Sequence, residues 1–306
     1  MSSLAWVLIA GVLGQAPEAS YVRRRVDAAA CEVPSSKAAC LHWEAGPGEV
    51  RTLPVQQATG GGADGEMHAA VSRSLATWNE AFAACGQLTF EERAPTGDRR
   101  FGYAQDGPNV SSVVFFDRAC RDLGQLEGCT PGEDCDLVHD CWDHDDRFLA
   151  LTLPTYDCAG RLLDSDVVVN GADFTLTTVD APACQPALDV CLCPGGGTSC
   201  VITDVENTLT HELGHVVGLD HIQLAGSTMS PWASPGETDK RVLDPGTRAF
   251  VCEVYPADGP VQTCVVPPLD AELGRSVGCG AGTPLLPASL LWWWRRRRPC
   301  ARRSMR

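Results

Sequence analysis

Residues 211–221 read HELGHVVGLDH, and this segment is the most informative part of the 306-residue chain about its architecture. Just upstream, Thr203–Glu206 has the form of a capping box, which predicts that a helix begins there. An apolar residue recurs at every fourth position and gives this helix one buried face. These residues are Val205, Leu209, Leu213 and Val217. Gly218 then ends the helix, because a residue without Cβ adopts the left-handed conformation most easily.

The same segment places three histidines for metal binding. His211 and His215 are one helical turn apart, so both imidazoles project from the same side of the predicted helix. That spacing lets two nitrogens reach one Zn²⁺ at about 2.0–2.1 Å. His221 follows the turn and supplies a third ligand, which leaves a fourth position for water, as in catalytic rather than structural zinc sites. Glu212 follows the first ligand, so its carboxylate reaches a metal-bound water rather than the metal.

Two other interpretations of these residues stay open. Three histidines also occur on ordinary amphipathic helices that bind no metal. An intact zinc site also occurs in proteins that no longer cleave anything, although the presence of Glu212 favours catalysis.

The HExxHxxGxxH arrangement of residues 211–221 resembles the metzincin signature. Met229 lies eight residues after His221 and resembles the Met-turn of that family, a core methionine placed under the zinc. The spacing is similar to that of the matrixins. The chain departs from the family at Met229–Pro231, where Met-Ser-Pro replaces the usual Met-Tyr-Pro, and it has no cysteine switch of the PRCG type.

Three further segments are similar to matrixin elements, so that the resemblance covers about residues 40–256. Asp164–Asn170 resembles a family strand, Asp204–Glu206 resembles the start of the active-site helix, and Asp244–Tyr255 resembles the closing helix.

The resemblance implies an α/β (α+β) metzincin fold. This fold has a twisted, mixed five-stranded sheet, a backing helix, an active-site helix and a small C-terminal subdomain with one helix. It also implies a monomeric zinc endopeptidase that acts on proteins or peptides. Zinc held by His211, His215 and His221 polarises the scissile carbonyl, and Glu212 takes the proton from the attacking water.

The residues alone support only metal-assisted hydrolysis. Two functions from other classes therefore stay open. One is a structural or adhesive cell-surface module in which zinc only supports the fold. The other is a zinc hydrolase of a different envelope polymer.

Apolar periodicity elsewhere predicts the remaining elements. Ala63–Ala84 has the three- and four-residue spacing of an amphipathic helix, with Asp64 as its cap. Asp244-Pro245 begins another helix, which runs to about Val254. Short apolar and β-branched runs predict five strands. They are Val50–Ala58, Leu88–Glu92, Ser112–Phe116, Leu149–Tyr156 and Asp164–Asn170.

The charge is distributed very unevenly along the chain. All 39 acidic residues lie before Cys279, whereas seven of the 24 basic residues lie after it. The part before Cys279 therefore carries 17 − 39 = −22. No basic stripe is left there to meet phosphates, which argues against a nucleic-acid partner.

Sixteen cysteines indicate either a disulfide framework in an oxidising compartment or several metal clusters. Fourteen of them lie between residues 31 and 264, an even number that allows seven disulfides. Cys120–Asp146 and Cys184–Cys200 each hold four cysteines and read as disulfide-stapled insertions into the domain. A zinc cluster is the alternative. The acidic insertion near 120–146 also suits structural Ca²⁺, with a solvated acidic loop as the alternative.

The N-terminal end predicts export. Residues 4–14 are apolar and have the length of a signal-peptide core, and cleavage after Gly14 or Ala19 fits the small residues there. A buried N-terminal helix is the alternative. We expect a signal peptide at 1–19, an N-terminal segment at 20–40, a catalytic domain at 41–264 and a linker at 265–275.

The C-terminal end, residues 276–306, has nineteen uncharged residues followed by Arg295–Arg298. With Cys279 between two glycines, this tail resembles the MYXO-CTERM sorting signal of myxobacterial surface proteins. The resemblance implies transient membrane association, processing near Cys279, and a secreted or cell-envelope location. A disordered basic tail is the alternative.

Overall fold

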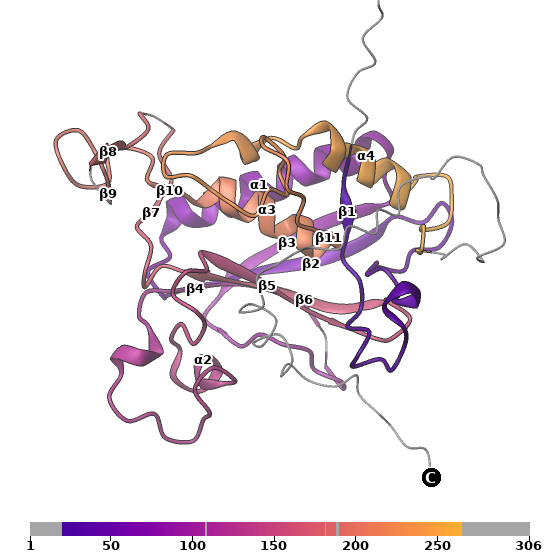
Figure 1. Ribbon diagram of the computed structural model, residues 1–306, viewed down its shortest axis with the longest axis horizontal. Coiled ribbons are helices and arrows are strands. Elements are labelled where there is room, and N and C mark those ends of the chain that lie inside the picture. The colour runs from indigo at the N-terminus through magenta and orange to yellow at the C-terminus, as the bar shows by residue number, and fades with distance from the viewer. Residues whose placement is uncertain (1–19, 108, 181, 188–189, 265–306) are drawn as a thin grey trace, which may run out of the picture.

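The computed structural model describes residues 20–264, except 108, 181 and 188–189, and shows a mixed α/β architecture (Figure 1). The predicted signal peptide, the linker and the C-terminal tail with Cys279 lie outside the described residues. Within residues 20–264, apart from those gaps, no helix combines the length and apolar character needed to span a bilayer.

A five-stranded mixed sheet forms the centre of the fold, as predicted. Its order is β3-β2-β4-β6-β5, in which β5 runs antiparallel to β6 and all other neighbours are parallel. The strands are β2 (Arg51–Ala58), β3 (Leu88–Thr96), β4 (Ser111–Phe116), β5 (Ala150–Tyr156) and β6 (Leu162–Asn170). Each matches one of the five predicted runs, because β-branched and apolar residues fit a pleated, half-buried surface. The antiparallel strand β5 lies at one edge of the sheet.

Three longer helices lie on one side of this sheet (Figure 1). They are α1 (Gly65–Cys85), α3 (Val205–Val216) and α4 (Pro245–Val254). Asp64 accepts hydrogen bonds from two backbone amides in the first turn of α1, and Asp244 does the same for α4. Both predicted caps are therefore confirmed. The family resemblance placed one helix after His221, and α4 is that helix.

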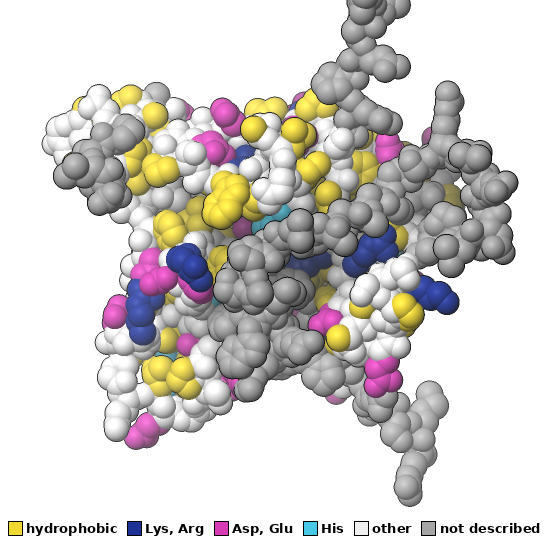
Figure 2. Space-filling view, in the orientation of Figure 1, with side chains coloured by type: hydrophobic (Ala, Val, Ile, Leu, Met, Phe, Trp, Pro, Cys, Tyr) yellow, Lys and Arg dark blue, Asp and Glu magenta, His cyan; other side chains and the backbone are white. Residues whose placement is uncertain are grey.

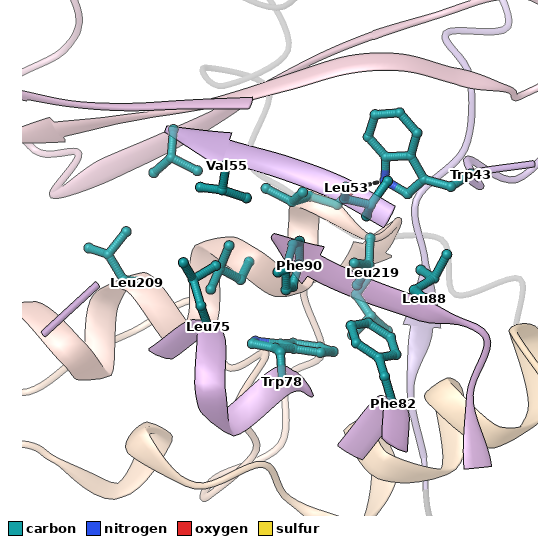
Figure 3. Close-up of a cluster of buried hydrophobic side chains, with 14 of the residues drawn as sticks. Trp43, Leu53, Val55, Leu75, Trp78, Phe82, Leu88, Phe90, Leu209 and Leu219 are labelled. Atoms are coloured by element: carbon teal, nitrogen blue, oxygen red, sulfur yellow. Dashed lines mark hydrogen bonds between the residues drawn. The ribbon is translucent and has the colours of Figure 1, made fainter. Parts of the chain in front are cut away.

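The main core lies between the helices and the sheet (Figure 3). Leu53 and Val55 of β2 face Leu75 and Trp78 of α1, with Leu209 of α3 beside them. The Trp78 indole nitrogen also donates to the Thr210 carbonyl at 2.9 Å, which joins α1 to α3. The core thus fixes α3 against both the sheet and the backing helix.

The opposite face of the sheet is also covered. Val168 packs there with Phe116 and Trp142, and Trp142 belongs to the acidic insertion. On the same face, the buried Asp166 carboxylate accepts from the Ser112 amide at 2.8 Å and the Gly102 amide at 2.6 Å. Burial beside Asp166 raises the pKa of Asp164 to about 8. This strand, similar to a matrixin strand, ties the loop before β4 to the sheet.

Seven disulfides use all fourteen cysteines between residues 31 and 264. They join Cys31–Cys158, Cys40–Cys264, Cys85–Cys252, Cys120–Cys141, Cys129–Cys135, Cys184–Cys191 and Cys193–Cys200. The disulfide framework is confirmed, and no thiolate in residues 20–264 is left for a zinc cluster. The last four disulfides lie within the two predicted insertions and close short local loops.

The insertions contain only short elements. The acidic one holds η2 (Cys120–Asp122) and α2 (Cys135–His139), and the other holds the hairpin of β8 (Gln185–Ala187) and β9 (Val190–Leu192). Two carboxylates of the acidic insertion already accept backbone hydrogen bonds, Asp134 from Thr130 and Asp143 from Gly132. Calcium binding there stays a prediction.

The remaining short elements lie outside the five-stranded sheet and the longer helices. They are β1 (Val22–Arg23), η1 (Ser35–Lys37), β7 (Leu176–Thr177), β10 (Thr203–Asp204), β11 (Leu219–Asp220) and η3 (Asp239–Arg241). Strand β1 pairs antiparallel with β11, directly after α3, and β10 pairs with β7 directly before it.

Candidate metal centre

Helix α3 begins at Val205, and its cap differs from the prediction. Asp204, not Thr203, is the N-cap, and its carboxylate accepts from the Asn207 amide at 2.7 Å. Thr203 lies in β10 and pairs there with β7. Glu206 pairs with the Arg73 guanidinium at 2.5 Å instead of reaching back to the helix start. The helix thus begins where the sequence predicts, but the capping box does not form, because Thr203 pairs with β7 and Glu206 pairs with Arg73 of α1.

The three histidines converge at one point. The His221 Nε2 lies 3.1 Å from the Nε2 of His211 and 3.1 Å from the Nε2 of His215. All three ligand atoms lie within 4.8 Å of one another, close enough to hold one metal ion. His211 and His215 are buried in α3, whereas His221 is exposed, and Figure 2 shows a histidine surface near the middle of the face it draws.

Hydrogen bonds at the other ring nitrogen aim two of these imidazoles. His211 Nδ1 donates to the Thr228 carbonyl at 2.7 Å, and His215 Nδ1 donates to the Leu219 carbonyl at 2.9 Å. Each bond leaves Nε2 as the lone-pair donor, as zinc requires. Burial lowers the pKa of His211 to about 3 and lowers the pKa of His215 and of His221 too. Three neutral imidazoles that converge through Nε2 fit a zinc ion.

Glu212 is buried beside these histidines on the same helix. Its carboxylate accepts a hydrogen bond at 2.6 Å from the Thr152 hydroxyl of the edge strand β5. Burial raises the pKa of Glu212 to about 7, against the smaller lowering effect of that hydrogen bond. The site therefore has a carboxylate whose pKa lies near neutral pH and whose orientation is fixed by a hydrogen bond. Sequence reasoning missed Thr152, because it lies 60 residues away and no motif marks it.

Met229 is fully buried against α3. A Cβ added to Gly214 would lie 2.3 Å from the Met229 sulfur, so only glycine lets the methionine approach this closely. The carbonyl of the preceding residue, Thr228, is the one that orients His211. Gly214 was missed from the sequence, although a glycine inside a helical pattern is itself a signal of close packing.

Gly218 lies in the turn that carries the chain from α3 to His221. Its φ is +99°, and an added Cβ would lie 2.5 Å from the Leu41 carbonyl oxygen. Both the backbone conformation and the close approach of Leu41 require glycine here. The helix itself ends at Val216, and Val217 is the C-cap.

Three convergent imidazoles with a buried carboxylate beside them define the class of a metal-dependent hydrolase. The family model for the matrixins (peptidase family M10) matches residues 52–255, well over half of the chain, and the chain therefore belongs to the matrixin family. The match makes it a metallopeptidase with a catalytic zinc. A comparison with curated proteins finds no match.

Proposed function

We propose that this chain is an exported zinc endopeptidase, which hydrolyses peptide bonds within protein substrates. One observation carries the proposal: His211, His215 and His221 converge through Nε2 beside the buried carboxylate of Glu212 in a matrixin chain. The three histidines would hold the zinc, which when bound polarises the scissile carbonyl and activates the attacking water.

The protein's own groups then handle the proton. Glu212 accepts the proton that the attacking water loses, and it later gives this proton to the leaving amine. The Thr152 hydroxyl holds one carboxylate oxygen, Oε2, so that the other is available to the reacting water. The Thr228 carbonyl keeps His211 in its orientation through both steps.

The position of β5 favours an extended polypeptide as the substrate. In the part of the chain that the structure describes, β5 pairs within the sheet only with β6, so its other edge is a site for strand addition. Thr152 lies on this strand and contacts Glu212 directly. A peptide added along β5 would therefore pass beside the proposed general base. A polymer without backbone amides could not form these main-chain hydrogen bonds with the edge of β5.

Export, sorting and calcium binding at the acidic insertion near 120–146 are part of the same proposal. Seven disulfides support folding in an oxidising compartment, reached through the signal peptide at 1–19. The tail at 276–306 would hold the protein transiently at the membrane until processing near Cys279. Mass spectrometry of protein from the cell surface or medium tests this, and a mature chain that keeps Arg295–Arg306 contradicts it.

The proposed activity is tested on the full chain, purified in its oxidised form. We expect it to cleave unfolded proteins, to stop when a zinc chelator is added, and to recover when zinc is restored. Glu212→Gln should lower the rate by about 10²-fold or more while zinc content stays near one per chain. Glu206→Gln is the matched control, because it changes the same side chain on the same helix but contacts Arg73 rather than the site.

Two outcomes decide against the proposal. If the wild type and Glu212→Gln are equally inert while both bind about one zinc, the zinc only supports a structural or adhesive surface module. If the wild type cleaves envelope polymers but no protein, the chain is a zinc hydrolase of another substrate class.

A further inference from the structure

Groups from outside α3 hold its C-terminal end. The last carbonyls of a helix have no partner within it and must find one elsewhere. Here the Trp43 indole donates to the Val216 carbonyl at 2.9 Å, and the Tyr255 hydroxyl donates to the Val217 carbonyl at 2.8 Å. The Arg24 backbone amide donates to the Gly218 carbonyl at 2.9 Å. Three successive carbonyls are thus satisfied by groups far away in the sequence.

Two of these three donors belong to residues 20–43, which we name the N-terminal strap. Its strand β1 pairs antiparallel with β11, and the two lie side by side in Figure 1. The strap then returns, and the Leu41 carbonyl lies against Gly218. Disulfides from Cys31 and Cys40 fix it to Cys158 and Cys264. The strap precedes residue 52, where the match to the matrixin family begins.

The third donor, Tyr255, is joined to the strap. Its hydroxyl oxygen accepts from the Trp43 backbone amide at 3.1 Å while it donates to Val217. Both side chains are buried, with Trp43 4% and Tyr255 0% exposed. Figure 3 shows Trp43 near Leu53 and Leu219, at the end of the core that adjoins β11. The two residues therefore form one hydrogen-bonded unit against the end of α3.

The turn that this unit holds serves two of the three histidines. The Leu219 carbonyl of β11 accepts from His215 Nδ1 and so aims that ring. His221 follows β11 immediately, so the path of residues 216–220 decides where its imidazole lies. If the turn kept this conformation in only a fraction of the molecules, the apparent zinc affinity of the site would fall by that fraction, because only those molecules could bind the metal.

We propose that Trp43 and Tyr255 are positioning residues of the metal centre, and that the N-terminal strap is part of that centre. The inference rests on the proposed function, in that it takes the three histidines as zinc ligands. Both residues act through the backbone of the turn, since neither side chain is a ligand.

The experiment compares zinc binding by full-length, oxidised Tyr255→Phe and Trp43→Phe with the wild type. Affinity is measured by competition with a chromophoric chelator, and unfolding is followed with and without zinc. We expect zinc to bind about 10-fold more weakly in each variant, as for other residues that orient metal ligands. The stability that zinc adds to the folded state should fall accordingly. Tyr21→Phe is the matched control, since that strap hydroxyl bonds Glu253 on α4 and not α3.

The outcomes separate the two proposals. If the variants lose equal stability with and without zinc, and their affinity is unchanged, Trp43 and Tyr255 only support the fold and the inference is wrong. If Tyr255→Phe does not fold, Trp43→Phe decides by the same criterion. A wild type that binds zinc but cleaves no protein overturns the proposed function, yet the affinities still decide whether these residues position the site.

Discussion

The two ends of α3 are held in different ways. At the N-terminal end, Asp204 caps the helix from the adjacent position and pairs with Arg241, while Glu206 pairs with Arg73. At the C-terminal end, neutral groups from residues 24, 43 and 255 satisfy the last carbonyls. Charges therefore decide where the helix begins, and uncharged donors from distant segments decide how it ends.

Because the two ends are held differently, we expect damage at one end to affect folding stability alone and damage at the other to affect zinc binding as well. The three proposed ligands are His211, His215 and His221, in the second half of α3 and beyond it. Damage to the N-terminal end should cost folding free energy whether or not zinc is bound. Damage to the C-terminal end should also reduce the stabilisation that zinc adds.

The largest loss of stability is expected from Asp204→Ala. Its carboxylate is fully buried, caps α3 and pairs with Arg241 at 2.5 Å. Its removal leaves a partly buried guanidinium without its main partner, so we expect a loss of about 3 kcal/mol. Denaturant unfolding should show the same loss in the zinc-free and zinc-loaded protein.

Asp180→Ala is the control for that measurement. Asp180 also pairs with Arg241, at 2.7 Å, but its side chain is 87% exposed. No measurable change is expected. A selective fall in zinc affinity on Asp204→Ala would show that the two ends of α3 are not separable.

A smaller loss, of about 2 kcal/mol, is expected from Gly218→Ala, because the new Cβ would meet the Leu41 carbonyl at a residue with φ of +99°. Here the zinc-dependent part of the stability should shrink as well, since the same turn leads to His221. Gly128→Ala separates the two causes: φ there is +79°, and nothing lies within 4 Å of an added Cβ. If both variants behave alike, the contact with Leu41 has no role.

The smallest effect concerns Asp244, which anchors the turn before Met229 through the Thr228 amide at 2.8 Å. Burial pushes the pKa of Asp244 upward, but hydrogen bonds from Thr247 and Thr228 outweigh it and hold the pKa below its usual value. The stabilisation is therefore present above about pH 4 and is lost as the pH falls further.

Asp244→Asn should accordingly cost about 1 kcal/mol at pH 6 and less at pH 3, where protonation has begun to remove the stabilisation. Denaturant unfolding of the zinc-free protein at the two pH values checks this. A penalty that stays constant between them would mean that the charge of Asp244 is irrelevant.

Patterns local in the chain were enough to predict most of the architecture. The strands β2 to β6, the helices α1 and α4, and the caps Asp64 and Asp244 all follow from apolar periodicity and short-range hydrogen bonding. The spacing of the three histidines likewise needs only the geometry of one helix and one turn. The cap of α3 was misassigned, because Glu206 pairs with Arg73 and Thr203 pairs with strand β7, and both partners lie outside the segment.

The sequence of this protein thus predicted its proposed metal ligands, its proposed general base and a framework of seven disulfides. Only the tertiary structure decided which cysteines pair, that Thr152 holds Glu212 across 60 residues, and that Trp43 caps α3 across 173. A helical period or a turn is set by neighbours a few residues away, so it leaves a pattern in the chain. A hydrogen bond between distant segments leaves none, because any residue with the right donor could supply it once the core has brought the segments together.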